Sequence, residues 1–437
     1  MLKILFSGLL LPVVLPAFAA TPDIAEFLDK EQTAAWETSS KDFKKNNGPG
    51  KLYRWNSTRK NSLHYAANRS AGPLYFQKWK ITEADFDFEN DKLKSLSLNI
   101  YNKSCSTNKT FADNKNVFLK FLDELRDSLN KFFKTSHSRI KINLLNSARC
   151  YSCYWNTPSA FAVLKWSYNG ANQYNFQAQY VTLDIYKDKK DFDATAAKKP
   201  RIEDLKSLVK TNEDGDRFLE IPMVDQGKRG YCVVACAERI LKYYQVDIDQ
   251  HILAQAANTS NMGTRTDDIE KSMKSVGVKC GFYVKDITEY SKLVGSRKII
   301  NFVKKYNRYA KRADKKEIDI RRVKTYNQLF RIMDQDILIK TKVHCDESGF
   351  KKFKSKVKDT IDSGIPVLWC VMLGMIKEPE LPQRIGSHMR LIIGYNPQKG
   401  EIVYSDSWGK AHDFKKMSWE KAWAMTQMAN IFVPKKR

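Results

Sequence analysis

The stretch DQGKRGYCVVACAERI, residues 225–240, carries two cysteines four residues apart, with a glutamine six residues before the first. Gly227 and Gly230 favour a turn, so the predicted helix begins at Cys232. A helix N-terminus stabilises a thiolate, which makes Cys232 the better nucleophile. Cys236 lies one turn further on, where the peptide N–H groups are used inside the helix. We expect Cys236 to be a small buried hydrophobic residue.

A cysteine nucleophile also needs an oxyanion donor and a base held by a third group. Gln226 lies on the glycine-containing loop, from which its amide can return to the start of the helix. His388 opens the predicted strand HMRLIIGY, and Asp406 lies in YSDSWG on the next strand, after a turn at residues 396–400. Asp406 is therefore expected to fix the tautomer of His388, and Trp408 to shield their bond from water.

The other histidines lack this context. His412 follows Trp408 and is the rival base, but it lies beyond Asp406 rather than on a paired strand before it. Surface or structural roles are expected for the remaining four, which are His64, His137, His251 and His344.

Together these residues resemble the papain-like cysteine peptidases. QGKRGYC matches the spacing of oxyanion glutamine to nucleophile, and SDSWG resembles the Asn-Ser-Trp-Gly segment with Asp in place of Asn. YCVVACAERILKYYQ is most similar to the bacterial peptidases that process bacteriocin leaders, the double-glycine peptidases, and GIPVLW before the histidine strand also fits. The resemblance covers about residues 218–437.

The resemblance implies that Gln226 is the oxyanion-hole donor, Cys232 the nucleophile, His388 the general base and then acid, and Asp406 the orienting group. Val233-Val234 replaces the Gly-Pro that often follows the nucleophile, and Gln245 replaces the usual Gly after the Tyr pair; both changes affect the expected substrate groove. The leader-processing enzymes are commonly fused to transporters, and no later apolar stretch here is long enough for a membrane helix. Leader processing is therefore not the inferred role.

The N-terminal segment MLKILFSGLLLPVVLPAFAA has one lysine, a short apolar run and a small-x-small pattern at Ala17-Phe18-Ala19. This pattern predicts a signal peptide over residues 1–20, with a retained anchor as the alternative. We expect a secreted or periplasmic bacterial protein that is not stably inserted in a membrane after signal removal. The chain as a whole has an ordinary globular composition, with 42% hydrophobic residues.

The chain of 437 residues is long enough for two or three domains. Alternating residues 92–101, an amphipathic pattern at 116–133 and a hairpin signal at Asn169-Gly170 predict an α+β N-terminal domain over 21–186. Residues 187–217 are charged and predict a linker with one short helix. Residues 218–437 place helices first and a mainly antiparallel sheet last. The expected fold class is α+β, with a papain-like domain of a helical subdomain and an antiparallel sheet.

Cysteine usage leaves alternatives open. The chain has eight cysteines, and Cys150 and Cys153 form a lone CxxC with no second pair to complete a zinc ribbon. A disulfide that involves Cys105, Cys150 or Cys153 is the favoured interpretation, and redox or metal chemistry there is only weakly indicated. No cofactor and no metal is expected.

The sequence therefore predicts an exported cysteine peptidase that acts on a protein or peptide. Two alternatives stay open: a transglutaminase-like acyltransferase with the same triad, and an inert binding or adhesion protein whose aromatic N-terminal domain holds a protein or glycan. In a further variant the N-terminal domain is an inhibitory pro-region released by cleavage in the linker. The net charge of +26 is spread through the chain, which fits a solvated surface that attracts an anionic cell-surface polymer and not a nucleic-acid site.

Overall fold

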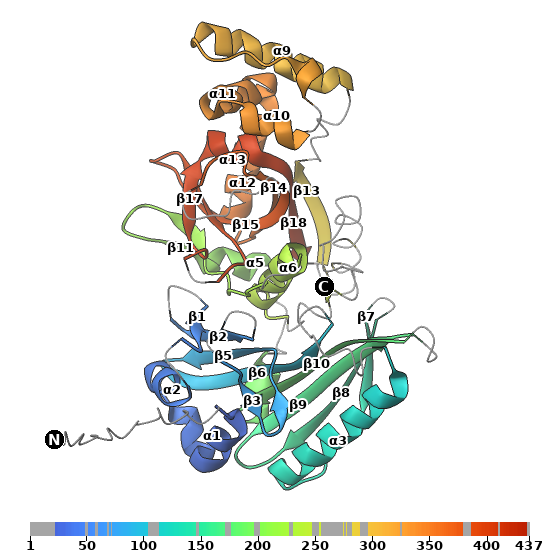
Figure 1. Cartoon of the computed structure of the whole chain (residues 1–437). Helices are drawn as coiled ribbons and strands as arrows, with labels where there is room; N and C mark the ends of the chain where they lie inside the picture. The colour runs from blue at the N-terminus through green and yellow to red at the C-terminus, as the bar shows by residue number, and fades with distance from the viewer. Residues whose placement is uncertain are drawn as a thin grey trace, which may run out of the picture.

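The computed structural model describes two domains stacked on each other, with the N-terminal one at the bottom of Figure 1. The described residues are 22–48, 51–56, 60–67, 70, 72–103, 113–145, 148–170, 176–195, 202–226, 230–246, 253–254, 274, 277, 282–288, 296–323, 326–378, 386–409 and 411–434. The predicted signal peptide, Cys105 and the helices predicted around residues 248–277 lie outside them, apart from single positions.

The N-terminal domain is an eight-stranded antiparallel sheet in the order β1-β2-β5-β6-β10-β9-β8-β7. Long pairing between β6, β10 and β9 forms its centre, and the predicted hairpin is confirmed because Gln177 on β10 pairs with Asn169 on β9. The strands are β1 Arg54–Trp55, β2 Ser62–Ala66, β5 Glu83–Glu89, β6 Lys92–Asn102, β7 Lys141–Leu145, β8 Ala148–Asn156, β9 Phe161–Asn169 and β10 Gln177–Tyr186, with a separate pair β3 Tyr75–Phe76 and β4 Trp79–Lys80.

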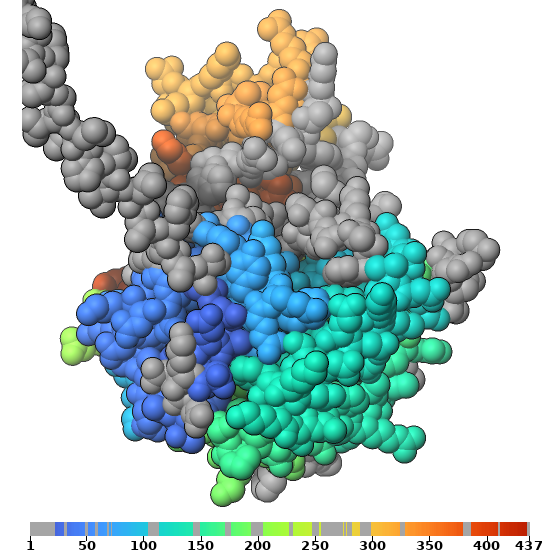
Figure 2. Space-filling model, turned by 60° about the horizontal axis from the view of Figure 1, so that its bottom comes forward, coloured from blue at the N-terminus to red at the C-terminus, as the bar shows by residue number. Residues whose placement is uncertain are grey.

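Helix α3, Lys115–Phe133, packs an apolar stripe on this sheet, as its periodicity predicts. The stripe is Phe118, Leu122, Leu125, Leu129 and Phe133. Asn114 caps the helix by accepting from the Val117 N–H. The shorter helices are α1 Ile24–Glu31, η1 Gln32–Glu37 and α2 Ser40–Asn46. In Figure 2 the blue surface of these N-terminal segments and the teal surface of α3 lie side by side on one face of the domain.

The segment predicted as a linker is partly structured. It contains α4 Lys189–Thr195, α5 Ile202–Leu205, η2 Lys206–Leu208, β11 Val209–Thr211 and β12 Arg217–Leu219. β11 and β12 form a hairpin, and β12 pairs with a strand of the second sheet through Arg217 and Phe218. The second half of the segment is thus built into the C-terminal domain rather than lying free between the domains.

The C-terminal domain has a second, mainly antiparallel sheet in the order β11-β12-β15-β14-β18-β13, with β16 and β17 added beside β15. Its strands are β13 Phe282–Thr288, β14 Val367–Leu373, β15 Gly386–Asn396, β16 Glu401–Ser405, β17 Lys415–Ser418 and β18 Thr426–Pro434. The strands predicted at 365–373, 388–396 and 401–408 correspond to β14, β15 and β16, and buried aliphatic and aromatic residues fill the core beneath them.

Helices complete this domain. α6, Cys232–Tyr243, lies between the second sheet and the N-terminal domain (Figure 1). The others are α9 Ser296–Arg312, η3 Ile320–Arg322, α10 Tyr326–Ile332, α11 Gln335–Cys345, α12 Glu347–Asp362 and α13 Trp419–Met425. None of the helices in the described part of the chain is both long and apolar enough to cross a bilayer.

Candidate active site

Cys232 is the first residue of α6, as the glycine pattern before it predicts. The residue is partly exposed, whereas the next residues of the helix are buried. The backbone N–H of Val233 contributes a hydrogen bond to this sulfur, and so does that of Met389 on β15. The start of the helix therefore supplies both exposure and donors to a thiolate.

His388 lies on β15 against this thiol. Its ring hydrogen bonds to Cys232, and its Nε2 donates to Asp406 Oδ1 at 2.9 Å. Because Nε2 is engaged by the carboxylate, Nδ1 is the nitrogen that meets the thiol. The paired strands β15 and β16, with Leu391 opposite Ser405, hold the two residues side by side.

The thiol and the imidazole shift each other's proton affinity. Burial raises the pKa of Cys232, but the hydrogen bond to His388, the charge of the imidazolium and the two backbone donors outweigh it and lower the pKa below its ordinary value. Burial lowers the pKa of His388, but hydrogen bonds to Asp406 and Cys232 outweigh it and raise the pKa to about 9. Each group thus favours the charged form of the other, the thiolate beside the imidazolium.

Two rival groups lie in different surroundings. Cys236 is fully buried, donates to the Met389 carbonyl at 3.4 Å, and burial raises the pKa of its thiol. Its reading as a small core residue is confirmed. The ring of His412 packs edge-on against Trp408 at 5.6 Å, and burial lowers its pKa. His412 thus contacts the indole of Trp408, whereas His388 contacts the Cys232 thiol.

Gln226 is buried beside the same segment. Its backbone N–H donates to the Ser407 carbonyl at 2.9 Å, and its side-chain oxygen accepts from the Ser407 hydroxyl at 2.8 Å. Engagement of the oxygen fixes which end of the amide is the donor. Since Ser407 follows Asp406 directly, this pair of bonds ties the glutamine to the carboxylate that holds His388.

Trp408 covers the imidazole. Its indole stacks on the His388 ring with centroids 4.3 Å apart and planes 15° from parallel. Asp406 beneath is fully buried, and its backbone N–H donates to the His412 carbonyl at 2.7 Å. The indole therefore excludes water from the bond between the imidazole and the carboxylate, as the sequence predicts, and its π face favours the protonated ring.

Two buried arginines complete the surroundings of Asp406, and neither was predicted. Arg239 on α6 donates to the Asp406 carbonyl at 2.9 Å, to the Ser405 hydroxyl at 2.6 Å and to the Pro222 carbonyl at 2.8 Å. Arg390 on β15 donates to Asp406 Oδ1 at 2.9 Å. Arg390 follows His388 by two residues, so period-two geometry puts both on one face of the strand, and that spacing was the available signal.

No group of three or more metal-ligating side chains gathers among the residues that the structure describes. The CxxC pair lies on β8, where residues three apart point to opposite faces, so Cys150 and Cys153 do not pair with each other. Cys153 is a free thiol, which contradicts a disulfide at that position, and burial raises its pKa to about 12. A strand core of this kind suits a small apolar residue, not a redox centre.

Comparison with known proteins gives one family match. Residues 218–431 match the model of the Peptidase_C39 like family. Eleven chains of solved structures are similar. Among them is the peptidase domain of Streptococcus ComA, described as a bi-functional ABC transporter involved in a quorum sensing pathway; it is 14% identical, with a TM-score of 0.25, and the match covers 49% of this chain and 100% of that chain. No curated protein matches.

The C-terminal half therefore has the papain-like fold of the double-glycine peptidase-like branch, and the match supports a cysteine peptidase-type function for this half. The predicted resemblance and the α+β fold class are confirmed. The family implies protein or peptide substrates.

Proposed function

We propose that the protein is an exported cysteine peptidase that hydrolyses peptide bonds with Cys232 as nucleophile, His388 as base and acid, and Asp406 as orienting group. The observation that carries the proposal is the continuous hydrogen-bonded chain from Cys232 through His388 to Asp406, with the thiol at a helix N-terminus. A lowered thiol pKa is what acyl transfer to sulfur requires.

In the proposed reaction the Cys232 thiolate attacks the scissile carbonyl carbon, and a C–S bond forms. The amide of Gln226 and the Cys232 N–H donate to the oxyanion of the tetrahedral intermediate. His388 gives its proton to the leaving amine as the C–N bond breaks. Neutral His388 then removes a proton from water, which attacks the thioester and releases the acid and the free thiol.

Export rests on the first twenty residues alone. Expression in a bacterial host followed by mass measurement of the exported chain tests it. Loss of residues 1–20 is the expected result, and an intact N-terminus on the cytoplasmic side contradicts export.

Hydrolysis is distinguished from transglutaminase-like transfer by running the reaction in ¹⁸O water with a labelled primary amine present. A peptidase shortens an unstructured protein substrate and puts ¹⁸O into the new C-termini. An acyltransferase attaches the amine to the substrate instead. Both activities vanish in Cys232→Ala, so retention of cleavage in that variant contradicts the assignment of the nucleophile.

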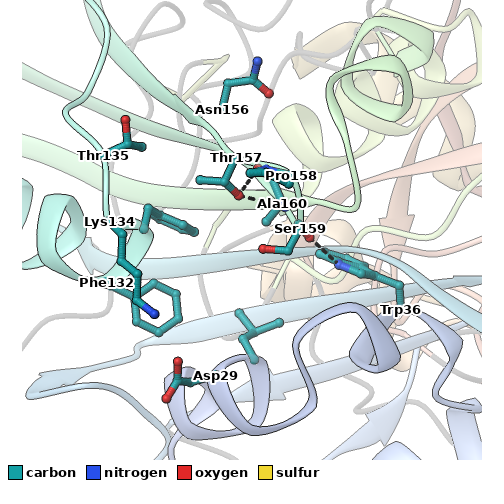
Figure 3. Close-up of a pocket in the computed structure, with 12 residues that line it drawn as sticks. Asp29, Trp36, Phe132, Lys134, Thr135, Asn156, Thr157, Pro158, Ser159 and Ala160 are labelled. Atoms are coloured by element: carbon teal, nitrogen blue, oxygen red, sulfur yellow. Dashed lines mark hydrogen bonds between the residues drawn. The ribbon is translucent and has the colours of Figure 1, made fainter.

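A second candidate function is supported by a pocket of about 440 Å³ in the N-terminal domain. It lies between α1, the end of α3 and the turn after β8, and residues such as Trp36, Phe132, Asn156 and Ser159 line it (Figure 3). Aromatic walls with a rim of hydroxyl, amide and charged groups suit a protein segment or a glycan. If binding is the main function, ligand retention survives Cys232→Ala and is lost when Ser159→Trp fills the pocket.

A pro-region role for the N-terminal domain stays a prediction. Asn56 Nδ2 donates to the Met223 carbonyl at 3.5 Å, so this domain touches the segment that leads to Gln226. Cleavage within residues 187–217 with a rise in activity supports inhibition. Full activity of the intact chain rules it out.

A further inference from the structure

The Asp406 carboxylate is held from two sides. Its Oδ1 accepts from His388 Nε2 and from Arg390 Nε, both at 2.9 Å. Arg390 and Asp406 are 0% exposed and His388 is 5% exposed, so the three groups interact without solvent between them. Among the described residues, Asp406 Oδ2 accepts no hydrogen bond. The ionised carboxylate therefore depends on the guanidinium and the imidazole for its stabilisation.

Arg390 is itself balanced by a second carboxylate. Its Nη1 donates to Glu378 Oε1 at 3.0 Å, and the Tyr404 hydroxyl donates to Glu378 Oε2 at 2.5 Å. The guanidinium also lies 4.9 Å from the Tyr404 ring and 5.9 Å from the Trp369 ring. A buried chain of alternating charge thus runs from His388 through Asp406 and Arg390 to Glu378.

We propose that Arg390 is a positioning residue that offsets the charge of Asp406, so that the pair acts on His388 as a nearly neutral hydrogen-bond acceptor. The inference rests on the proposed function, because it concerns the base of that reaction. Glu378 acts in the opposite direction, since it takes up part of the Arg390 charge.

The offset matters for the second half of the reaction. A full negative charge in a buried site favours the imidazolium strongly, and an imidazolium cannot take a proton from water. The positive charge of Arg390 weakens the effect of Asp406 on His388, and the negative charge of Glu378 weakens the effect of Arg390 on Asp406. The titratable and charged groups that act on members of this cluster are Cys232, Cys236 and Arg239 on α6, Tyr404 on β16, and His412 after Asp406. Asp225 and Lys415 act on His412, and Asp413 acts on Arg239.

The test is an NMR titration of His388 in the full chain carrying Cys232→Ala, which removes the thiol and any turnover. In that background Arg390→Met should raise the pKa of His388 by about one unit, because the carboxylate charge is no longer offset. Glu378→Gln should lower it by roughly half a unit, because Arg390 then acts on Asp406 alone. Opposite signs are the prediction, and general disturbance of the core does not produce them.

Two further variants serve as controls. Arg390→Lys keeps the charge and should leave the pKa of His388 near that of the parent. Tyr404→Phe removes one hydrogen bond to Glu378 without changing any charge, and should shift the pKa least. If Arg390→Met does not raise the pKa of His388, or if Arg390→Met and Glu378→Gln shift this pKa in the same direction, the proposal is overturned. If Arg390→Met does not fold, Glu378→Gln decides alone, and an unchanged or raised pKa contradicts the proposal.

The titration needs no substrate, so its outcome is separate from that of the proposed function. In chains that keep Cys232, the basic limb of kcat/KM should move to higher pH in Arg390→Met. Shifted titrations with no peptide hydrolysis would refute the proposed function and keep the electrostatic role of Arg390. Peptide hydrolysis with an unshifted pKa of His388 in the variants would support the proposed function and refute the role of Arg390.

Discussion

At the scale of single residues, the site works through the different surroundings of two cysteines on one helix. Cys232 meets an imidazole and two backbone donors, whereas Cys236, one turn later, is fully buried and bonds to the Met389 carbonyl and the Ser407 side chain. The same helix thus holds one thiol of lowered pKa and one of raised pKa. Position relative to the helix start therefore separates the proposed nucleophile from the core thiol.

Gln226→Ala tests the oxyanion assignment. Loss of one preorganised donor typically reduces kcat by about 100-fold, and we expect that loss with little change in KM. The rate of Cys232 alkylation should stay unchanged, because the thiol and His388 are untouched. Ser407→Ala, which removes the hydroxyl that donates to the Gln226 side-chain oxygen and keeps the amide itself, is the matched variant and should cost roughly tenfold in kcat. Equal losses in alkylation and in kcat would contradict a role confined to the oxyanion.

The pH dependence of activity follows from His388. Its pKa is raised to about 9, so the imidazolium that pairs with the thiolate persists below that pH and is lost as pH rises through it. We expect kcat/KM to fall on the basic side near pH 9. Because the pKa of His388 is higher in the folded protein than in the unfolded chain, its charged form also stabilises the fold. This stability is fully present below pH 6.5 and is lost as the pH rises through about 9. A basic limb near pH 7 would show that the ion pair is not the active form.

The catalytic roles of the four side chains stay predictions, but their spacing in the sequence was enough to choose residues that the structure links through hydrogen bonds around Asp406 and Ser407. It missed Arg239 and Arg390 as partners of Asp406, although both sit at regular spacing beside predicted residues. A lone arginine in an apolar strand or helix does not reveal its partner, because the partner comes from another element. Glu378 was even less predictable, since it contacts Arg390 from a loop rather than from a regular element.

At the scale of elements, α6 and the β15–β16 pair position the whole site, and both were predictable. The helix begins at Cys232, and β15 and β16 are joined by a turn that follows the fully buried Asn396. The β11–β12 hairpin was not predictable, because its charged residues resemble a linker. It joins the sheet through contacts that lie far apart in sequence, among them the ion pair of Arg217 with Asp362.

Gly364 joins α12 to β14, the neighbour of the strand that carries His388. It has φ +75°, and a Cβ there would lie 1.9 Å from the Leu205 carbonyl oxygen. Gly364→Ala should therefore destabilise the protein by about 3 kcal/mol or more, from backbone strain and a clash with rigid main chain. Gly400→Ala is the matched control, with φ +66° and no neighbour within 4 Å, and should cost about 1 kcal/mol. Urea unfolding of both variants measures the difference, and equal costs would contradict it.

At the scale of the whole molecule, charged groups of the two domains interact beside Gln226, the proposed oxyanion donor. His64 on β2 lies 2.8 Å from Asp85, and Asp225, one residue before Gln226, acts on it from the other domain. Burial lowers the pKa of His64, but Asp85, Asp225 and Glu83 outweigh it and raise the pKa to about 9. The protonated ring therefore stabilises the contact of the two domains near neutral pH.

His64→Gln tests that contact. The stability that His64 contributes is fully present below pH 6.5 and is lost as pH rises through about 9, because the folded pKa is raised. At pH 6 we expect a loss of about 2 kcal/mol, allowing for screening at the partly exposed Asp85, and little loss at pH 9.5. Thermal unfolding across this range measures it, with His344→Gln as the exposed control. A loss that grows with pH would contradict the sign.

The central claim is that Cys232 is an activated nucleophile, and alkylation tests it without a substrate. The folded full chain is treated with iodoacetamide at about pH 5.5, where an ordinary thiol is only about 0.1% thiolate, and the modified cysteines are mapped by mass spectrometry. Cys345 is the internal reference, because the residue is exposed and partial desolvation raises the pKa of its thiol. Fast labelling of Cys232, lost in His388→Ala, is the predicted result. Uniformly slow labelling, or labelling of Cys236 in place of Cys232, would contradict the account.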